Sequence, residues 1–452
     1  MGEYAEQFKK IGFSIFIGFF VSVLSLTVFN PTQASLLGII AFLVVLWTNE
    51  GLPLAVVSLL PIVLFPAFEI LNTKATTVNY AHPIIYLFLG GFMLAIAVQK
   101  SNLHTFIADK MLSLFPNTPR GMIFSLSITA GLLSSILSNT TTTLLLMSIA
   151  LFITDDIKLK MRFALGIAYG ASVGGILTPI GTPPNLILLG IMHDKGMEAI
   201  PFFQWMWMVA PLVVIMFIVV SLLLSLGVPN TPIKRESDKK PLDIAQKKIL
   251  YIMGGLIFLL LLNAPMKPFW GGLGLSEAGI LLSAGLLLFV PPFSLLRWDE
   301  DSKKIPYKIM FLFGAGFSIA KAFSETGLAD EVASYLIVMT DLPPILLLFC
   351  VAMLITFTTE ITSNTALISI MLPVIYSVAE QTGINTTLFM MVATLCASYA
   401  FMLPIATPPN AIAMSSGAVN VKSMIRYGIF LNFAGIFFIV MIAEFFWKGI
   451  LS

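Results

Sequence analysis

Two short blocks of hydroxyl and amide side chains, each set inside a long apolar segment, hold the residues of this chain that could do chemistry. The blocks are Ser138-Asn139-Thr140 and Ser363-Asn364-Thr365, and the second lies 225 positions after the first. Each is followed by a helix-breaking sequence at the same offset, Thr182-Pro183-Pro184-Asn185 in the first case and Thr407-Pro408-Pro409-Asn410 in the second. Separated matches at one constant offset indicate that the chain contains two copies of one unit.

The blocks and breaks suit the binding of a small anion. Ser, Thr and Asn favour the N-cap position and proline favours the first turn, so each block and each break predicts the start of a helix. The free N–H groups at such a start carry the positive end of the helix dipole and can hold an anion without an arginine. For a single block, interhelical hydrogen bonding or local capping is the alternative, and the duplication makes it the weaker interpretation.

The same breaks also suit a small cation. They free backbone carbonyl groups, which together with Ser and Asn oxygens form a neutral cage of hard oxygen ligands. Because such a cage contains no carboxylate, a bound Na⁺ keeps its full charge and can offset an adjacent anion. This pairing predicts a transporter that couples cation and anion.

Composition excludes several other classes of protein. The chain has 452 residues, of which 58% are hydrophobic and 11% are charged, and this predicts a polytopic membrane protein. The formal net charge is only +2 and no basic run is interleaved with aromatic residues, so a nucleic-acid partner is not expected. Cys350 and Cys396 lie in apolar segments and predict buried thiols rather than a disulfide or metal site.

The elements that must position the blocks are helices, so we expect an all-α polytopic membrane protein. It should have about 11 transmembrane helices plus two re-entrant helical hairpins, each with a Ser-Asn-Thr block at its tip. The predicted units are a first inverted repeat over 1–227 with spans 1–6 and a hairpin at 121–154, a cytoplasmic linker over 228–248, and a second inverted repeat over 249–452 with spans 7–11 and a hairpin at 344–380. The predicted spans run over 11–29, 35–48, 52–71, 82–101, 162–193, 205–227, 249–263, 276–292, 307–323, 386–416 and 425–447, with spans five and ten broken at their prolines.

Charge predicts the orientation of this arrangement. With a cytoplasmic N-terminus, most lysines and arginines fall on the cytoplasmic face, while Lys74, Lys195, Lys267 and Lys448 fall on the other. That bias agrees with the positive-inside rule and places the C-terminus outside a cell membrane. Span four then runs inward and its repeat, span nine, runs outward. The repeats are therefore predicted to be inverted, with the binding site at their interface near the midplane.

The paired blocks and breaks, in repeats joined by a hydrophilic linker, resemble the divalent anion/sodium symporter (DASS) family. The resemblance covers nearly the whole chain and includes the Phe-Leu-Gly-Gly-Phe of span four and the stretch from Glu360 to Thr365. It implies a secondary active transporter for dicarboxylates, citrate or sulfate. It also implies a homodimer that works as an elevator, in which the hairpins, the broken spans and spans six and eleven move against a scaffold.

The resemblance also implies site residues. The substrate would be held by Ser138, Asn139, Thr140, Ser363, Asn364 and Thr365, in a cavity lined by Thr182, Pro183, Thr407 and Pro408. A first sodium site would use Ser134, Ser138, Asn139 and the backbone of Gly181. A second would use Thr359, Ser363, Asn364 and the backbone of Ala406. Sodium-coupled symport of succinate-type dicarboxylates is the favoured function.

Several alternatives stay open on sequence alone. Sodium-independent dicarboxylate exchange and transport of sulfate or citrate share these motifs. A cation/proton antiporter would normally place an Asp at the helix breaks, which are neutral here. A passive anion channel would not need cation cages, and an intramembrane enzyme would need a nucleophile with a base or a set of metal ligands that we do not find.

Five polar residues outside the motifs need an interpretation. Glu360, three positions before Ser363, predicts either a structural hydrogen-bonding role or a role in proton or substrate coupling, with the structural role favoured. Lys321 is expected to reach the surface from the end of its span. His82 and His193 share no ligand spacing with each other or with His104, so no metal site is expected from histidines.

Overall fold

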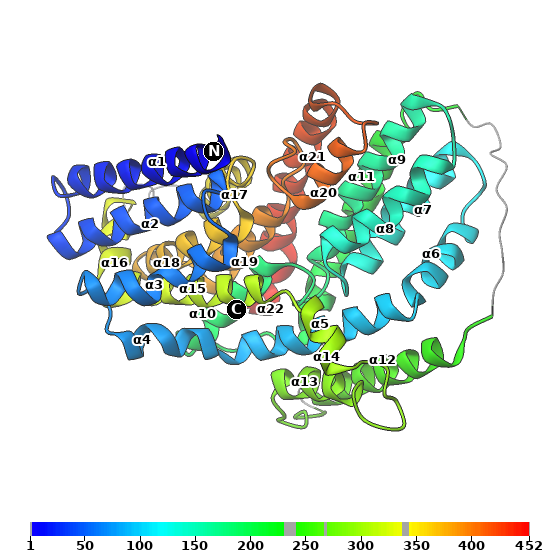
Figure 1. Ribbon diagram of the computed structural model, residues 1–452, viewed down its shortest axis with the longest axis horizontal. Helices are drawn as coiled ribbons and strands as arrows, with labels where there is room; N and C mark the ends of the chain where they lie inside the picture. Colours follow the sequence, from blue (N-terminus) through cyan, green and yellow to red (C-terminus); the bar gives the residue numbers. More distant parts are fainter. Residues whose placement is uncertain (1, 230–240, 266–268, 337–342, 452) are drawn as a thin grey trace.

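The computed structural model describes residues 2–229, 241–265, 269–336 and 343–451 and is all-α (Figure 1). The first half contains α1 (Gly2–Ser25), α2 (Pro31–Asn49), α3 (Leu54–Ala67), α4 (Thr73–Thr77), η1 (Val78–Ala81), α5 (Pro83–Lys100), α6 (Leu103–Ser113), α7 (Pro119–Ser134), α8 (Asn139–Phe152), α9 (Ile157–Gly175), α10 (Pro183–Asp194) and α11 (Phe202–Ser225). The second half contains α12 (Ile244–Asn263), α13 (Glu277–Leu287), α14 (Trp298–Asp301), η2 (Ser302–Lys304), α15 (Tyr307–Glu325), α16 (Leu328–Leu336), α17 (Pro344–Thr359), α18 (Asn364–Thr382), α19 (Thr386–Ser398), α20 (Pro408–Ser415), α21 (Val421–Ile442), the π-helix η4 (Ala443–Trp447) and α22 (Lys448–Leu451).

Local sequence determines where many of these helices begin. The side chain of Asn30 accepts the N–H of Gln33 and the side chain of Gln33 accepts the N–H of Asn30, which forms a capping box at α2. Asp243 and Gln246 repeat this arrangement at α12. Proline occupies the first turn of α5, α7, α10 and α20, where the missing N–H has no helical partner to lose.

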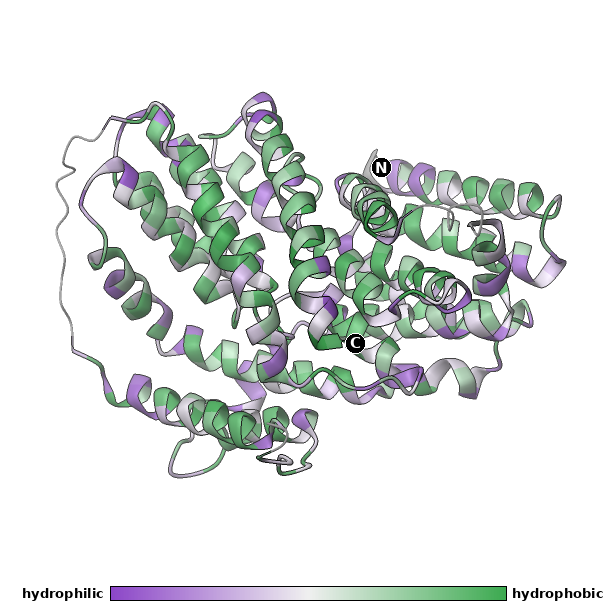
Figure 2. Ribbon diagram, turned by 180° about the vertical axis from the view of Figure 1, so that it is seen from behind, coloured by the Kyte–Doolittle hydropathy of each residue, from purple (hydrophilic) through white to green (hydrophobic). Residues whose placement is uncertain are grey.

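Seven helices in the described part of the chain are long and apolar enough to cross a membrane. They are Tyr4–Ser25, Pro31–Asn49, Thr73–Lys100, Phe202–Ser225, Ile244–Asn263, Asn364–Thr382 and Val421–Leu451. Shorter apolar helices include α3, α8, α13, α17 and α19. Hydrophobic residues run along the long helices, and hydrophilic ones gather at helix ends and connections (Figure 2). The fold is that of a multi-pass membrane protein, and the number of eleven crossing spans stays a prediction.

The helix breaks fall where the sequence predicts them. The 121–154 segment divides into α7 and α8, which are separated by residues 135–138, and the 344–380 segment divides into α17 and α18, separated by 360–363. The bounds of α7 and α17, Pro119–Ser134 and Pro344–Thr359, differ by the same offset of 225 as the motifs. This agreement concerns the positions of the helices along the sequence. It does not test their direction across a membrane, so the inversion of the repeats stays a prediction.

Close backbone contacts hold the helices that carry the motifs. α7 packs against α9 and α11, and α17 packs against α19 and α21. Glycine is required between α7 and α9, because a Cβ atom on Gly174 would lie 2.2 Å from the Cα of Gly131. Such small residues let backbones approach closely, which is how helices associate where the surroundings are as apolar as the helices themselves. α7, α8, α9 and α11 gather at one end of the molecule and α1 to α4 at the other (Figure 1).

Candidate functional site

One cavity of about 370 Å³ brings both motifs and both breaks together. Its lining contains all ten residues predicted to hold the substrate or to line its cavity: Ser138, Asn139, Thr140, Thr182, Pro183, Ser363, Asn364, Thr365, Thr407 and Pro408. Gly181 and Ala406, whose backbones are expected to bind sodium, line it as well. Residues separated by more than 200 positions therefore face one space.

The four helices that start at the motifs and the breaks all begin at this cavity. The first residues of α8, α10, α18 and α20 are Asn139, Pro183, Asn364 and Pro408, and each lines the cavity. The N-terminal ends of four helix dipoles thus meet at one place, and each presents N–H groups that have no partner within its own helix. This arrangement favours an anion in the cavity, and the motifs contribute no acidic side chain to oppose it.

The hydroxyl groups at these helix starts are used differently in the two halves. In the first half, Ser138 accepts the N–H of Thr141 (3.2 Å) and Thr182 makes no side-chain cap bond. In the second half the pattern is reversed, because Thr407 accepts the N–H of Asn410 (3.3 Å) and Ser363 makes no side-chain cap bond. One hydroxyl in each half is therefore not engaged in capping and is available to a bound species.

The two motif asparagines are anchored in the same way. The hydroxyl of Ser134 donates to Asn139 Oδ1 (2.5 Å), and the hydroxyl of Thr359 donates to Asn364 Oδ1 (2.7 Å). Ser134 and Thr359 are fully buried and lie behind the asparagines rather than in the cavity lining. Each half thus holds a hydroxyl oxygen and an amide oxygen side by side. Neutral, hard oxygen ligands of this kind suit a small hard cation such as Na⁺.

The asparagines of the two Pro-Pro-Asn breaks hold the broken spans in shape. Asn185 Nδ2 donates to the carbonyl of Thr178 (2.9 Å), and Asn410 Nδ2 donates to the carbonyl of Leu403 (3.0 Å) at the equivalent position. Both side chains are fully buried. The hydrogen bonds fold each break back on itself and so position the backbone that precedes α10 and α20.

Glu360 ties the second hairpin to the second break. Its carboxylate accepts the N–H groups of Phe401 (2.8 Å), Met402 (2.9 Å) and Leu403 (2.9 Å), and Asn432 Nδ2 donates to it at 2.6 Å. The side chain is 3% exposed and is not part of the cavity lining. This geometry supports the structural alternative for Glu360, because these four donors can satisfy the carboxylate without substrate.

The first half makes the corresponding connection without a charge. Ser135, the residue 225 positions before Glu360, accepts the hydroxyl of Thr178 at its backbone carbonyl (2.5 Å). The two breaks are therefore held by different chemistry at equivalent places. A sequence repeat alone does not reveal this difference.

The cavity also contains residues that the motifs do not indicate. Lys308, at the start of α15, lines the cavity and is exposed. Phe88, Phe92 and Leu312 supply apolar walls. Phe88 and Phe92 belong to the Phe-Leu-Gly-Gly-Phe of span four, a signal that could have identified them, whereas Leu312 and Lys308 belong to no such motif.

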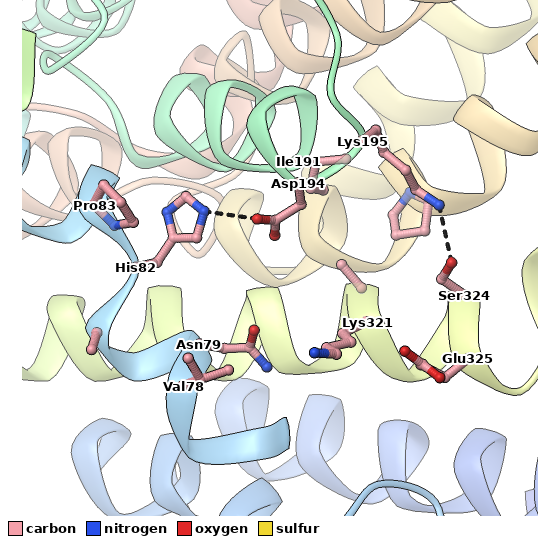
Figure 3. A pocket seen from close by; sticks show the side chains of 13 residues that line it. Val78, Asn79, His82, Pro83, Ile191, Asp194, Lys195, Lys321, Ser324 and Glu325 are labelled. Carbon is pink, nitrogen blue, oxygen red and sulfur yellow. Dashed lines mark hydrogen bonds and ion pairs between the residues drawn. The ribbon is translucent and has the colours of Figure 1, made fainter. Parts of the chain in front are cut away.

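A second cavity of about 440 Å³ lies at the far end of α10. His82 and Asp194 line it and are joined by a contact of 3.0 Å between His82 Nε2 and Asp194 Oδ1. Lys321 lines the same cavity (Figure 3). His193, which shares no ligand spacing with His82 in the sequence, lies beside it with ring centroids 5.2 Å apart.

Known proteins resemble this chain in sequence and in fold. A family model described as the citrate transporter (CitMHS) matches residues 42–393. The sodium-dependent dicarboxylate transporter of Staphylococcus saprophyticus is 29% identical, over 95% of this chain and 90% of that protein. The protein of the same name from a Staphylococcus aureus strain is 30% identical, over 97% of this chain and 93% of that protein.

Two solved structures share the fold. The YdaH transporter of Alcanivorax borkumensis aligns with a TM-score of 0.61 at 15% identity, over 83% of this chain and 88% of that one. MtrF of Neisseria gonorrhoeae, described with a class of antimetabolite efflux pumps, aligns with a TM-score of 0.59 at 13% identity, over 82% of each chain. At these identities the likeness concerns the fold alone. The family match and the identity to the dicarboxylate transporters carry more weight, and they exclude an enzyme. This chain is a membrane transporter that belongs to the citrate transporter family and, with these relatives, to the divalent anion/sodium symporters that its motifs resemble.

Proposed function

We propose that this protein is a secondary active transporter that couples the inward movement of Na⁺ to the uptake of dicarboxylates of the succinate, malate and fumarate type. The observation that carries the proposal is the single cavity at which both motifs and four helix N-termini meet. The names of the relatives agree with it, since they describe sodium-dependent dicarboxylate transporters.

A dianion with a carboxylate at each end matches a cavity that has two similar binding surfaces. Ser138, Asn139 and Thr140 would receive one carboxylate, and Ser363, Asn364 and Thr365 would receive the other. Thr182, Pro183, Thr407 and Pro408 would line the space between. Charge-assisted hydrogen bonds from helix N–H groups and hydroxyls would then replace the water lost by each carboxylate.

Two sodium ions would complete the site. The first would be bound by Ser134, Ser138, Asn139 and the carbonyl of Gly181, and the second by Thr359, Ser363, Asn364 and the carbonyl of Ala406. The hydroxyl and amide oxygens that lie together in each half support this assignment. Two Na⁺ ions offset the charge of one dianion, so sodium binding would prepare the cavity for substrate.

The proposed transport cycle is an elevator movement in a homodimer of the cell membrane. Residues 1–227 and 249–452 would form inverted repeats joined by a cytoplasmic linker over 228–248, with the C-terminus outside. α7 to α11 and α17 to α21 would move against the remaining helices. The packing of α7 on α9 and α11, of α17 on α21, and of α11 on α21 supports one cooperating body.

Uptake of labelled succinate into proteoliposomes tests this function. We expect accumulation above equilibrium when an inward sodium gradient is imposed, and no accumulation when choline replaces sodium. Uptake that needs succinate inside the vesicles but no sodium would identify an exchanger. Equilibration without accumulation would identify a channel, and uptake of citrate or sulfate in place of succinate would change the substrate assigned to the cavity.

A further inference from the structure

Three side chains with the chemistry of metal ligands lie together at the end of α10, and two of them, His82 and Asp194, line the second cavity. His82 is the residue before α5, and His193 and Asp194 come from the last turn of α10. Figure 3 shows His82 directed toward Asp194. One ligand atom of each lies within 4.8 Å of the corresponding atoms of the other two. The cavity is separate from the one that contains the motifs, since the two linings share no residue.

The distances are close to those of a tetrahedral metal centre. His82 Nε2 lies 3.0 Å from Asp194 Oδ1, and His193 Nδ1 lies 3.5 Å from the same oxygen. Ligands about 2 Å from a tetrahedral zinc ion lie roughly 3.3 Å from one another. The histidine ligand nitrogens lie within 4.8 Å of each other, and the 62% exposed side chain of His193 has room to turn toward His82.

The contacts of His82 orient its ring for metal binding. Its side chain is 6% exposed and its ring lies against the ring of Phe317, with centroids 4.4 Å apart and the ring planes tilted by 36°. The N–H of Ile84 donates to Nδ1 (3.3 Å), which turns Nε2 toward Asp194. Metal binding would move the Nε2 proton to Nδ1 and give up this long contact, so the affinity should be lower than that of a structural zinc site.

The other charged groups of the cavity do not occupy this position. Lys195 is directed away, because its Nζ donates to Ser324 Oγ (3.0 Å) and lies 4.7 Å from the centre of the Tyr376 ring. Lys321 and Glu325 line the α15 side of the cavity, opposite Asp194 (Figure 3). Their opposite charges offset each other on that wall, so the net field does not exclude a cation.

We propose that His82, His193 and Asp194 form a binding site for a divalent transition-metal ion, best suited to Zn²⁺, with water as the fourth ligand. Two imidazoles and one carboxylate are the ligand set that such ions prefer over Mg²⁺ or Ca²⁺. The ion would connect the start of α5 to the end of α10. This inference rests on the proposed function, in which α10 moves while α5 belongs to the scaffold. Bound metal would then hold the two helices together and inhibit transport.

Metal binding can be measured without transport and with a matched control. The chain contains three histidines, and the third, His104, is buried on α6 with Nδ1 3.2 Å from the carbonyl of Val98. We expect the purified protein to bind one equivalent of Co²⁺ with visible absorption of a tetrahedral centre, and Zn²⁺ to displace it. His82→Ala and His193→Ala should each weaken binding at least tenfold, while His104→Ala should bind as the wild type does.

Equal Co²⁺ binding by wild type and His193→Ala would overturn the site, and so would the absence of stoichiometric binding by the wild type. His193→Ala keeps this test decisive if His82→Ala fails to fold, because the His193 side chain is exposed. In proteoliposomes, Zn²⁺ should lower succinate uptake by the wild type at least fivefold more than uptake by His193→Ala. If the protein binds Co²⁺ but Zn²⁺ inhibits the wild type and His193→Ala equally, the metal site stands and the inhibitory link between α5 and α10 is overturned. Protein that binds Co²⁺ but transports no succinate would count against the proposed function alone.

Discussion

At the scale of single residues, the two motif asparagines are the points where ion and substrate would meet. Asn139 and Asn364 line the cavity as the first residues of α8 and α18, and each receives a hydroxyl hydrogen bond from a buried residue behind it. A side chain that is fixed from one side and exposed to the cavity on the other is preorganised for binding.

We therefore expect Asn139→Ala and Asn364→Ala each to reduce sodium-driven succinate uptake by tenfold to a hundredfold or more. Hydrogen bonds to charged groups are worth about 1.5–3 kcal/mol, which corresponds to this range. Uptake assays with purified variants in proteoliposomes measure the effect. Asn72→Ala is a control, since Asn72 is likewise an asparagine at a helix start, where its side chain caps α4, but it does not line the cavity. Normal uptake by either cavity variant would show that the two halves do not contribute equally.

At the scale of elements, specific hydrogen bonds as well as helix propensity fix the positions of the helix pairs α7–α8 and α17–α18 and of the two breaks. Glu360 holds three consecutive backbone N–H groups of the second break, while the first break uses the hydroxyl of Thr178. The carboxylate is thus part of the element that places Ala406 and Thr407 at the cavity.

Glu360→Gln distinguishes a structural role from a coupling role. The amide would turn an N–H₂ group toward at least one of the backbone N–H groups and lose about 1.5–3 kcal/mol per charge-assisted hydrogen bond. We expect a lower melting temperature in detergent together with loss of uptake. A variant that melts like the wild type but transports without dependence on sodium or proton gradients would show that Glu360 couples transport instead.

Asp301 forms a similar tie outside the spans, between α5 and the connection that precedes α15. Its side chain is 2% exposed and accepts Lys100 Nζ (2.6 Å), the N–H of Arg297 (2.9 Å) and Lys304 Nζ (3.0 Å). Burial by itself raises the pKa of this carboxyl, but the three donors outweigh burial and lower the pKa to about 2.

This lowered pKa predicts a pH dependence of stability. Since the folded-state pKa lies below the ordinary value, the stabilisation is present above about pH 4 and is lost as the pH falls toward 2. The shift corresponds to about 2 kcal/mol. Asp301→Asn should therefore lower the melting temperature at pH 7, and its difference from the wild type should narrow between pH 4 and pH 2.5. A difference that stays constant over this range would show that the carboxylate charge does not contribute.

The bounds of the helices could be predicted from the sequence better than the hydrogen bonds and contacts between the helices. The duplicated motifs predicted both divided hairpins and both breaks, because an offset between sequence patterns carries over directly to helix bounds. Glu360 was recognised as significant, but its backbone partners lie 41 to 43 positions away and Asn432 lies 72 positions away, so these contacts could not be predicted. The position of Lys308 in the cavity and the pairing of His82 with Asp194 likewise depend on how distant helices pack, which no local pattern encodes.

At the scale of the whole molecule, the proposed mechanism requires the two halves to face opposite sides of the membrane. Lys308 lines the motif cavity, and the proposed orientation would place this residue, and with it the cavity opening, on the cytoplasmic side. In transporters with inverted repeats, the two halves can exchange their conformations and so expose the site to each face in turn.

Asp155 and Glu380 test the inversion because they occupy equivalent positions, 225 residues apart, after α8 and near the end of α18. Both are exposed. In a background with Cys350→Ala and Cys396→Ala, we expect Asp155→Cys to react with an impermeant thiol reagent only from the cytoplasmic side, because Lys158, Lys160 and Arg162 follow it. Glu380→Cys should react only from outside, since the second hairpin returns to the opposite face. Both cysteines should react in permeabilised membranes, which controls for accessibility. Labelling of both from one side would show that the repeats are parallel, and an elevator movement built on inverted repeats would then have to be abandoned.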